Sequence, residues 1–348
     1  MHHAPAHQID NWNDQHARLV KIFVYEHITG GGCAGDPLPV ALLPEAAMML
    51  SALGADLRAI AGLELSGLRD ARVAAAARDW DERVVDGPAA WQAGFDALVR
   101  ASDAVWLIAP ETDRVLERLS ARVLDARKTL LGSAPRAIAV AASKLATARA
   151  LRLADIAVVP TQRVSEAEIR GPCVAKPDDG CGCEQTRKFP SLLAADAWIG
   201  AQSTPARYVV QPYLAGEALS LSVIATPAGA VLLSVNRQRV ELRDDAFSFA
   251  GCEVNVSVEG VDELARLAAR AVAAIPGLWG YVGIDFLLTE SGPVVLEVNP
   301  RLTTSYAGLH AAIGVNPAQL VLELLAGRAP VAPLLGRRAV MVDLRQKL

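Results

Sequence analysis

Two apolar runs near the C-terminal end decide the fold, Gly280-Tyr-Val-Gly-Ile-Asp-Phe-Leu-Leu288 and Pro293-Val-Val-Leu-Glu-Val-Asn299. Each has the length of a strand, and the residues between them include a Ser-Gly turn signal, so the pair predicts an antiparallel hairpin. If the turn centres on Ser291, Asp285 lies directly opposite Glu297. Two acidic side chains then face each other across an otherwise apolar ladder.

Opposed carboxylates repel each other and destabilise a hairpin, unless a cation lies between them. Asn299 shares a face with Glu297, because strand side chains alternate. Two carboxylates and an amide oxygen suit Mg²⁺ or Mn²⁺, and Mg²⁺ also tends to take phosphate oxygens. Gly283 would leave room there for a ligand; two solvated acids on an exposed face are the alternative. Four residues are predicted to point the other way, into a core: Ile284, Phe286, Leu296 and Val298.

Two lysines are candidates for binding the phosphates that such a metal requires. Lysine is rare here, only six of the 34 basic residues. Lys176 ends an apolar run before the loop Pro177-Asp-Asp-Gly-Cys-Gly-Cys183, where an ammonium and backbone N–H groups could surround a polyphosphate. Lys144 follows Ser143, a good N-cap, at a helix start that favours anions. Two ordinary surface lysines are the alternative.

The segment Tyr208-Val-Val-Gln-Pro-Tyr-Leu-Ala-Gly-Glu217 lies between the lysines and the carboxylates. Its apolar strand runs into Pro212, which lacks an N–H, so the following backbone could offer bare N–H and C=O groups to a flat heterocycle. Glu217 could accept a hydrogen bond from a ribose hydroxyl. By itself this segment is weak evidence.

The first half predicts a parallel, doubly wound sheet, because short apolar runs alternate with helical Ala/Arg-rich segments. A strand is expected at Leu19–Tyr25 and helices at 41–53, 91–101 and 113–131. Further strand-like apolar runs are Leu57–Ile60, Arg83–Val85, Ala104–Ile108 and Ala137–Val140.

The second half predicts antiparallel α+β structure, because hairpin turns join several of its strands. Expected strands, besides the hairpin, are 173–176, 208–211, 218–226 and 230–235. Expected helices are 144–153, 192–202, 261–274 and 305–326, the last broken near 314–317.

Composition narrows the class of protein. The 348 residues are 52% hydrophobic and 21% charged, with a net charge of −4. No basic field points to nucleic acid or an anionic membrane, and no apolar stretch of about 18 residues lacks a charge, Pro or Gly. Residues 1–18 lack the apolar centre of a signal peptide and are expected to be a mobile tail. The five cysteines favour a reducing compartment. A cytoplasmic globular protein is expected.

Two motifs are weaker than they look. Gly30–Gly35 satisfies G-x-G-x-x-G, but Pro37 and Pro39 follow, where a dinucleotide site needs a helix. A flexible turn or a substrate-cleft loop are the alternatives. Cys173, Cys181 and Cys183 lack a second pair or a nearby His to complete a zinc tetrahedron. The histidines of the N-terminal tail are read as solvated: His2, His3, His7 and His16.

The order of these features closely resembles the ATP-grasp ligases over about residues 126–327. The resemblance implies an α/β Rossmann-like N-terminal layer (19–125) followed by two α+β subdomains: a central lid (126–207) and a C-terminal subdomain with the metal site (208–330), then a tail strand (331–348). Ser143 departs from the acidic or amide residue of many members, but its capping role survives.

The resemblance also implies residue roles. Lys144 and Lys176 would bind ATP phosphates, and Arg301 would steady the reacting carboxylate, with Lys176 also catalytic. The remaining implied nucleotide residues are Gly180, Gly182, Gln211, Tyr213, Leu214 and Glu217. The implied metal ligands are Asp285, Glu297 and Asn299.

Three further segments resemble the tyramine–glutamate ligases of methanofuran-type cofactor synthesis: 23–32, 176–184 and 234–239. That resemblance implies that the γ-carboxyl of glutamate is joined to tyramine or tyrosine. The pyrrolysine-pathway ligase is a neighbouring resemblance. Implied substrate residues are Gly31, Gly32, Arg237 and Gln238, with Arg237 on the α-carboxylate or, alternatively, paired with Glu241.

The expected reaction is ATP-dependent amide formation through an acyl phosphate, with small-molecule carboxylate and amine partners. A nucleotide-binding module without turnover is the main rival, and a biotin-type carboxylase is a third option. The sequence leaves the oligomeric state open, and a homodimer is among the states it allows.

Overall fold

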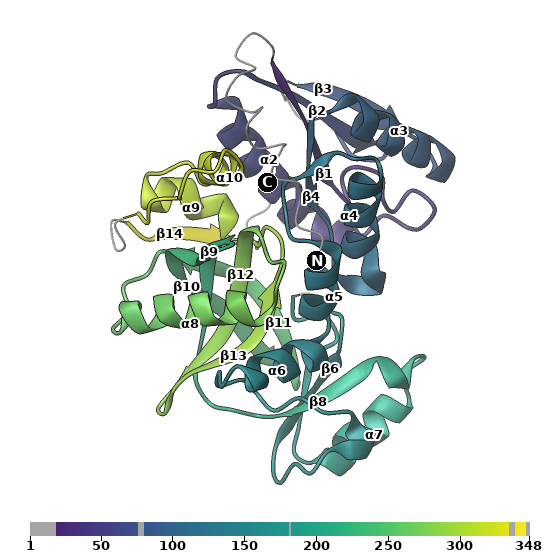
Figure 1. Cartoon of the computed structure of the whole chain (residues 1–348). Helices are drawn as coiled ribbons and strands as arrows, with labels where there is room; N and C mark the ends of the chain where they lie inside the picture. Colours follow the sequence, from purple (N-terminus) through teal and green to yellow (C-terminus); the bar gives the residue numbers. More distant parts are fainter. Residues whose placement is uncertain (1–18, 76–79, 181, 334–337, 346–348) are drawn as a thin grey trace.

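The computed structural model describes residues 19–75, 80–180, 182–333 and 338–345. Its first sheet is five-stranded, with the order β3-β2-β1-β4-β5 and every pairing parallel (Figure 1). The strands are β1 (Val20–Glu26), β2 (Leu63–Asp70), β3 (Asp81–Val85), β4 (Ala104–Ile108) and β5 (Thr129–Leu130). The helices between them are η2 (Val40–Leu42), α2 (Leu43–Arg58), α3 (Pro88–Ala101), η3 (Thr112–Arg114) and α4 (Val115–Asp125).

Alternation along β1 explains why this sheet is covered on both faces. Ile22 and Val24 pack in the core cluster that includes apolar residues of α2. Phe23 and Tyr25 point the opposite way, into the cluster that includes residues of α3 and α4. The predicted parallel sheet with helices on both faces is therefore confirmed.

The second sheet is nine-stranded and antiparallel, with the order β13-β12-β9-β10-β11-β7-β6-β8 and β14 beside β11. Its strands are β6 (Cys173–Pro177), β7 (Arg187–Phe189), β8 (Tyr208–Pro212), β9 (Glu217–Thr226), β10 (Gly229–Arg243), β11 (Ala246–Val254), β12 (Gly280–Thr289), β13 (Gly292–Asn299) and β14 (Val340–Asp343). The helices of this half are α5 (Pro135–Ala142), α6 (Lys144–Leu153), η4 (Val164–Glu166), α7 (Leu192–Gly200), η5 (Pro205–Arg207), α8 (Val261–Ala274), α9 (Tyr306–Ile313) and α10 (Pro317–Leu325).

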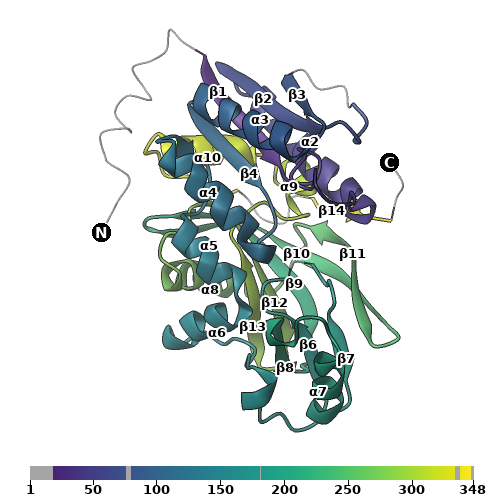
Figure 2. The same cartoon turned by 90° about the vertical axis from the view of Figure 1, so that its right-hand side faces the viewer.

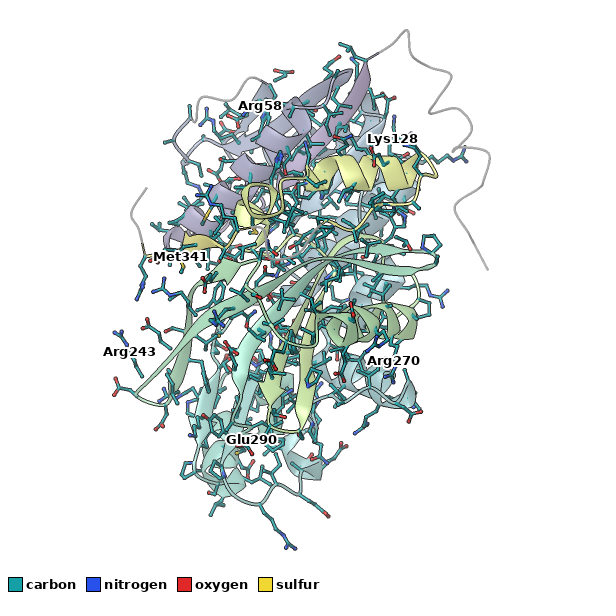
Figure 3. The ribbon with its side chains drawn as sticks, turned by 90° about the vertical axis from the view of Figure 1, so that its left-hand side faces the viewer. Arg58, Lys128, Arg243, Arg270, Glu290 and Met341 are labelled. Atoms are coloured by element: carbon teal, nitrogen blue, oxygen red, sulfur yellow. The ribbon has the colours of Figure 1, made fainter. Side chains whose placement is uncertain are left out.

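Helices α5, α6 and α8 cover one face of the second sheet (Figure 2), with which they share a core. We call β6, β7, α7 and β8 the lid; it has a separate small core. Two long hairpins, β10–β11 and β12–β13, extend away from the parallel sheet (Figure 3). Arg243 lies at the tip of the first and Glu290 at the tip of the second, whereas Arg58 and Lys128 lie near the parallel sheet.

Helix α2 joins the two halves, because it packs on β1 and β2 and also on α9 and α10. Together with η2 it is also the one described helical run with the length and apolar composition of a membrane span, and 39% of that window is buried. Its Asp56 is buried; the carboxylate accepts a hydrogen bond from the Tyr306 hydroxyl at 2.8 Å, and the backbone carbonyl accepts one from the Asn316 amide at 2.8 Å. Polar bonds and a shared core thus tie this helix to the C-terminal half.

Several predicted elements need correction. The apolar runs 57–60 and 137–140 are not strands: the first ends α2 and the second lies within α5. The second strand is instead β2, which was not predicted because it mixes polar and apolar residues. Strand β5 extends the parallel sheet beyond residue 125, and β8 pairs with β6, so the strand beginning at Tyr208 belongs to the lid. Helices α6 and α8 have the predicted bounds.

Candidate functional site

The site begins at the β12–β13 hairpin, where Asp285 lies opposite Glu297 and Gly283 opposite Asn299, as predicted. A register shift follows Asp285, so that Phe286 pairs with Val295.

Two details of the prediction need correction. Val295 is fully buried in the core, whereas Leu296 lines the cavity. The space expected beside Gly283 is occupied, since a Cβ atom there would lie 2.6 Å from Cγ2 of Thr303.

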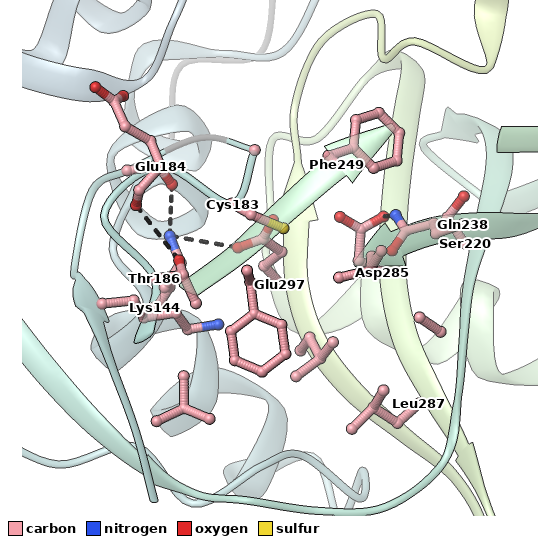
Figure 4. A pocket seen from close by; sticks show the side chains of 18 of the residues that line it. Lys144, Cys183, Glu184, Thr186, Ser220, Gln238, Phe249, Asp285, Leu287 and Glu297 are labelled. Atoms are coloured by element: carbon pink, nitrogen blue, oxygen red, sulfur yellow. Dashed lines mark hydrogen bonds and ion pairs between the residues drawn. The ribbon is translucent and has the colours of Figure 1, made fainter. Parts of the chain in front are cut away.

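A cavity of about 450 Å³ lies over the face of the sheet that carries the two acids. Asp285 accepts a hydrogen bond from the Gln238 amide at 2.9 Å (Figure 4). It accepts another from the Asn299 amide at 3.1 Å. Burial and the charge of Glu297 raise the pKa of Asp285 well above its ordinary value. Burial would also raise the pKa of Glu297, but the charges of Lys144 and Lys176 outweigh it and lower that pKa. The pair therefore holds carboxylates of unequal acidity.

Both predicted lysines line the same cavity. The Lys144 ammonium lies 3.3 Å from Oε2 of Glu297 and donates to the Gly180 carbonyl at 2.6 Å. Lys176 is 8% exposed, and burial lowers its pKa to about 8, with Glu297 opposing this shift and Lys144 adding to it. Two buried cations near an acid pair form a site suited to an anion together with a cation.

Asp178 explains how the two lysines come together. Its carboxylate accepts hydrogen bonds from the Leu145 N–H and the Ser143 hydroxyl, each at 2.9 Å, and its carbonyl accepts one from the Lys144 N–H. The Ser143 hydroxyl also caps α6 by accepting from Ala146 at 3.0 Å. The loop after Lys176 is therefore fastened to the helix start that carries Lys144.

The segment 208–217, which we call the hinge, forms another wall of the cavity, through Gln211, Tyr213 and Leu214. The buried Gln211 amide donates to the Thr161 hydroxyl at 2.8 Å, and the Tyr213 N–H donates to the Pro172 carbonyl. Gly180 and Gly182 also line the cavity.

Two predicted ligands, Glu217 and Arg237, do not line the cavity. Strand alternation gives the reason: Ala218 and Gln238 do line it, so their neighbours in sequence point to the other face. There Nε of Arg237 lies 2.5 Å from Glu217, and Nη1 lies 3.0 Å from Glu253. The alternative pairing of Arg237 with Glu241 is replaced by these two contacts.

Gly31 and Gly32 are also not among the cavity residues. Added Cβ atoms there would lie 2.4 Å from Val85 and 2.1 Å from the ring of His27, so these glycines permit close packing. The helix that a dinucleotide site needs starts only at Leu43, after a chain of turns.

The described residues include only some of the cysteines and histidines considered above. Cys173 and Cys183 are free thiols, and Cys181 lies outside the described residues, as do the four tail histidines. Across the described ranges, no group of three or more His, Cys, Asp or Glu side chains could hold a metal ion.

Arg301 lines the cavity from the segment after β13. Its guanidinium forms an ion pair with Glu111, a buried residue after β4, at 2.9 Å. Sequence reasoning missed further cavity residues: Glu45, Ser220, Cys252, Thr303, Thr304 and Ser305. The hydroxyl run 303–305, which begins two residues after Arg301, was a usable signal, whereas nothing in the sequence singles out Glu45.

Comparison with known families agrees with this geometry. Residues 141–305 match the family model described as an ATP-grasp domain, and residues 63–138 match that of a pre ATP-grasp 3 domain. Among solved structures, an ATP-grasp superfamily protein from Archaeoglobus fulgidus superimposes with a TM-score of 0.71 and 26% identity, covering 93% of this chain and 92% of that one. An L-amino acid ligase from Bacillus licheniformis shares the fold, with a TM-score of 0.64, 15% identity, and coverage of 90% and 75%.

Among curated proteins, the tyramine–L-glutamate ligase of Methanocaldococcus jannaschii is 31% identical over 209 residues, which is 60% of this chain and 58% of that protein. The D-alanine–D-alanine ligase of Mycobacterium avium is 31% identical over 209 residues, covering 52% and 56%. This chain therefore spans a little over half the length of these relatives.

Proposed function

This chain belongs to the ATP-grasp family, and we propose that it is an ATP-dependent ligase that joins a carboxylate to an amine through an acyl phosphate. The observation that carries the proposal is one cavity lined by Lys144, Lys176, Asp285, Glu297 and Arg301. Opposite charges lie together there, with the Lys144 ammonium 3.3 Å from Glu297, and a module without turnover would not require the full set.

The donor set fits Mg²⁺ or Mn²⁺. Asp285, Glu297 and Asn299 supply two carboxylates and an amide oxygen, and the charge of Glu297 adds to burial in raising the pKa of Asp285. These three residues would hold the ion, which would neutralise the charge of the two acids and supply positive charge to the phosphates of ATP. The remaining charges of the site come from side chains of the protein itself.

In the proposed reaction, a carboxylate oxygen attacks the γ-phosphorus of ATP, the bond to ADP breaks, and an acyl phosphate forms. An amine then attacks the acyl carbon, loses a proton and displaces inorganic phosphate. Lys144 and Lys176 would bind the phosphates, and Arg301 would neutralise charge on the reacting carboxylate. Catalysis would rest on positioning and charge stabilisation, without a covalent enzyme intermediate.

For the substrates, we propose the γ-carboxyl of glutamate and tyramine or tyrosine. Support comes from the name of the archaeal relative and from the three resembling segments, while the mycobacterial relatives favour another amino-acid pair as the alternative. The free thiols of the described cysteines are compatible with the reducing cytoplasm that we propose as its location.

The decisive experiment uses glutamate labelled with ¹⁸O in its carboxylates, together with Mg-ATP and tyramine. We expect ADP, a product with the mass of the amide, and one ¹⁸O atom in the released phosphate, because the acyl phosphate passes a carboxylate oxygen to phosphate. Phosphate without the label would contradict the acyl-phosphate route. ADP formation with another acid–amine pair, but not with this one, would contradict only the substrate assignment.

A further inference from the structure

A buried ion pair joins the parallel sheet to the cavity. Oε2 of Glu111 accepts a hydrogen bond from Nε of Arg301 at 2.9 Å and lies 2.9 Å from Nη2, although 190 residues separate the two in the chain. The side chains are only 6% and 13% exposed. Nη1 of Arg301 donates to the Leu302 carbonyl at 3.0 Å. Contacts at Nε and both terminal nitrogens define the orientation of the guanidinium plane.

The Glu111 carboxylate contacts Arg301 through one of its two oxygens. Its second carboxylate oxygen is buried and has no hydrogen-bond partner among the described residues. The nearby buried Glu26 uses its oxygens on Ile28 and Thr29 instead, at 2.6 to 3.1 Å. A buried ion pair is a weak source of net stability, because both groups lose water, but it can fix one arrangement.

The segment that carries Glu111 is itself held in place. Asp113 and Arg114 have φ values of 53° and 58°, a left-handed conformation that is uncommon outside glycine. The Thr112 hydroxyl donates to the Asp179 carbonyl at 3.1 Å, and the Asp113 N–H donates to the side-chain carboxylate of Asp179 at 3.0 Å. One short segment therefore contacts both Arg301 and the loop after Lys176.

We propose that Glu111 is a positioning residue, which holds the Arg301 guanidinium in the orientation that the reacting carboxylate requires. This inference rests on the proposed ligase function. Glu111 does not line the cavity, so it would act only through Arg301. Nucleotide binding, which depends on the lysines and the hinge, should not need it.

The test is a double-mutant cycle of Glu111→Gln and Arg301→Lys, with Glu117→Gln as the matched control. Glu117 forms an ion pair at 2.6 Å with Arg114, an exposed residue of the same region. We expect Glu111→Gln to lower kcat at least tenfold and to leave the KM for ATP within twofold. The double variant should equal Arg301→Lys within twofold, because both changes remove the same interaction. The control should keep wild-type kcat.

Losses that multiply in the double variant, or wild-type kcat in Glu111→Gln, would overturn the proposal. If Glu111→Gln does not fold, Glu111→Asp retracts the carboxylate but keeps its charge, and a reduced kcat is again expected. The Nε–H resonance of Arg301 in ¹⁵N-labelled protein, assigned by its loss in Arg301→Lys, gives a readout independent of turnover. An unchanged resonance in Glu111→Gln overturns the positioning role, whereas absent wild-type turnover with a shifted resonance refutes only the ligase function.

Discussion

At the scale of single residues, the cavity depends on charges that are paired unequally. Glu297 is the counter-charge of Lys144, while Asp285 relies on amide donors and is disfavoured as an anion. Equivalent-looking substitutions of the two acids should therefore differ in their effects.

We expect Asp285→Asn to spare or raise the stability of the metal-free protein and Glu297→Gln to lower it by about 1–3 kcal/mol. A raised folded-state pKa means that Asp285 favours the fold at low pH and costs stability as pH rises through that pKa, so at neutral pH its removal relieves a cost. Glu297→Gln instead leaves Lys144 unpaired. Urea unfolding in EDTA checks the order, and both variants should lose Mg-dependent ADP formation. The reverse order of stabilities would contradict this account.

Lys176 gives the site a pH dependence. Because its pKa is about 8, the ammonium loses its proton as pH rises through 8, and the affinity for ATP should fall there. Lys176→Met should weaken ATP binding at least tenfold at pH 7, and Lys176→Arg should bind ATP without the decline above pH 8. Calorimetric titrations between pH 7 and 9 measure this, with the exposed Lys21→Met as control. Equal affinity of the methionine variant and the wild type would exclude Lys176 from the phosphate site.

At the scale of elements, the start of α6 is both a helix cap and part of the site. Ser143 caps α6 and also donates to Asp178, whereas Ser191 caps α7 through the same kind of bond to Ala194. The two serines form a matched pair that separates capping from function.

Ser143→Ala and Ser191→Ala should each cost about 1 kcal/mol of unfolding free energy, the usual value of an N-cap. Only Ser143→Ala should also weaken ATP binding, by at least threefold, because it loosens the loop that sets Lys144 beside Lys176. Chemical denaturation and calorimetry on both variants test this. Equal ATP affinity in the two variants would show that the cap of α6 has no role in the site.

At the scale of the whole molecule, hydrophobic packing joins some parts of the chain more extensively than others. One hydrophobic cluster joins α2 and the first sheet to α9 and α10. The lid has its own small cluster, and polar bonds fasten it to the rest, such as those of Asp178 to Leu145 and of Asp179 to Asp113. The lid should therefore open without global unfolding.

Hydrogen exchange tests this arrangement. Amides of β6 and β8 should exchange faster than those of β1 and β12, and Mg-ATP should slow the lid amides selectively, because the nucleotide would bridge the lid and the β12–β13 hairpin. Mass spectrometry of peptides from each strand measures both effects. Lid amides as protected as those of β12, or unaffected by nucleotide, would mean that the lid opens only when the molecule unfolds.

Sequence reasoning predicted the features that depend on local rules. Alternation and a turn signal were enough to place Asp285 opposite Glu297, and the scarcity of lysine together with an N-cap singled out Lys144 and Lys176. The parallel sheet with two covered faces followed from alternating runs. The same rules failed where local patterns are ambiguous, as for the run 57–60, which reads as a strand but ends α2.

Only the tertiary structure decided which face of a strand meets the cavity and which distant groups complete it. A single bulge after Asp285 moved Leu296 into the cavity, and strand pairing turned Glu217 and Arg237 away from it. The contact of Glu111 with Arg301 joins segments 190 residues apart, and no local pattern encodes such a pairing. Sequence period fixes alternation within a strand, whereas register, bulges and long-range contacts depend on the packing of the whole chain.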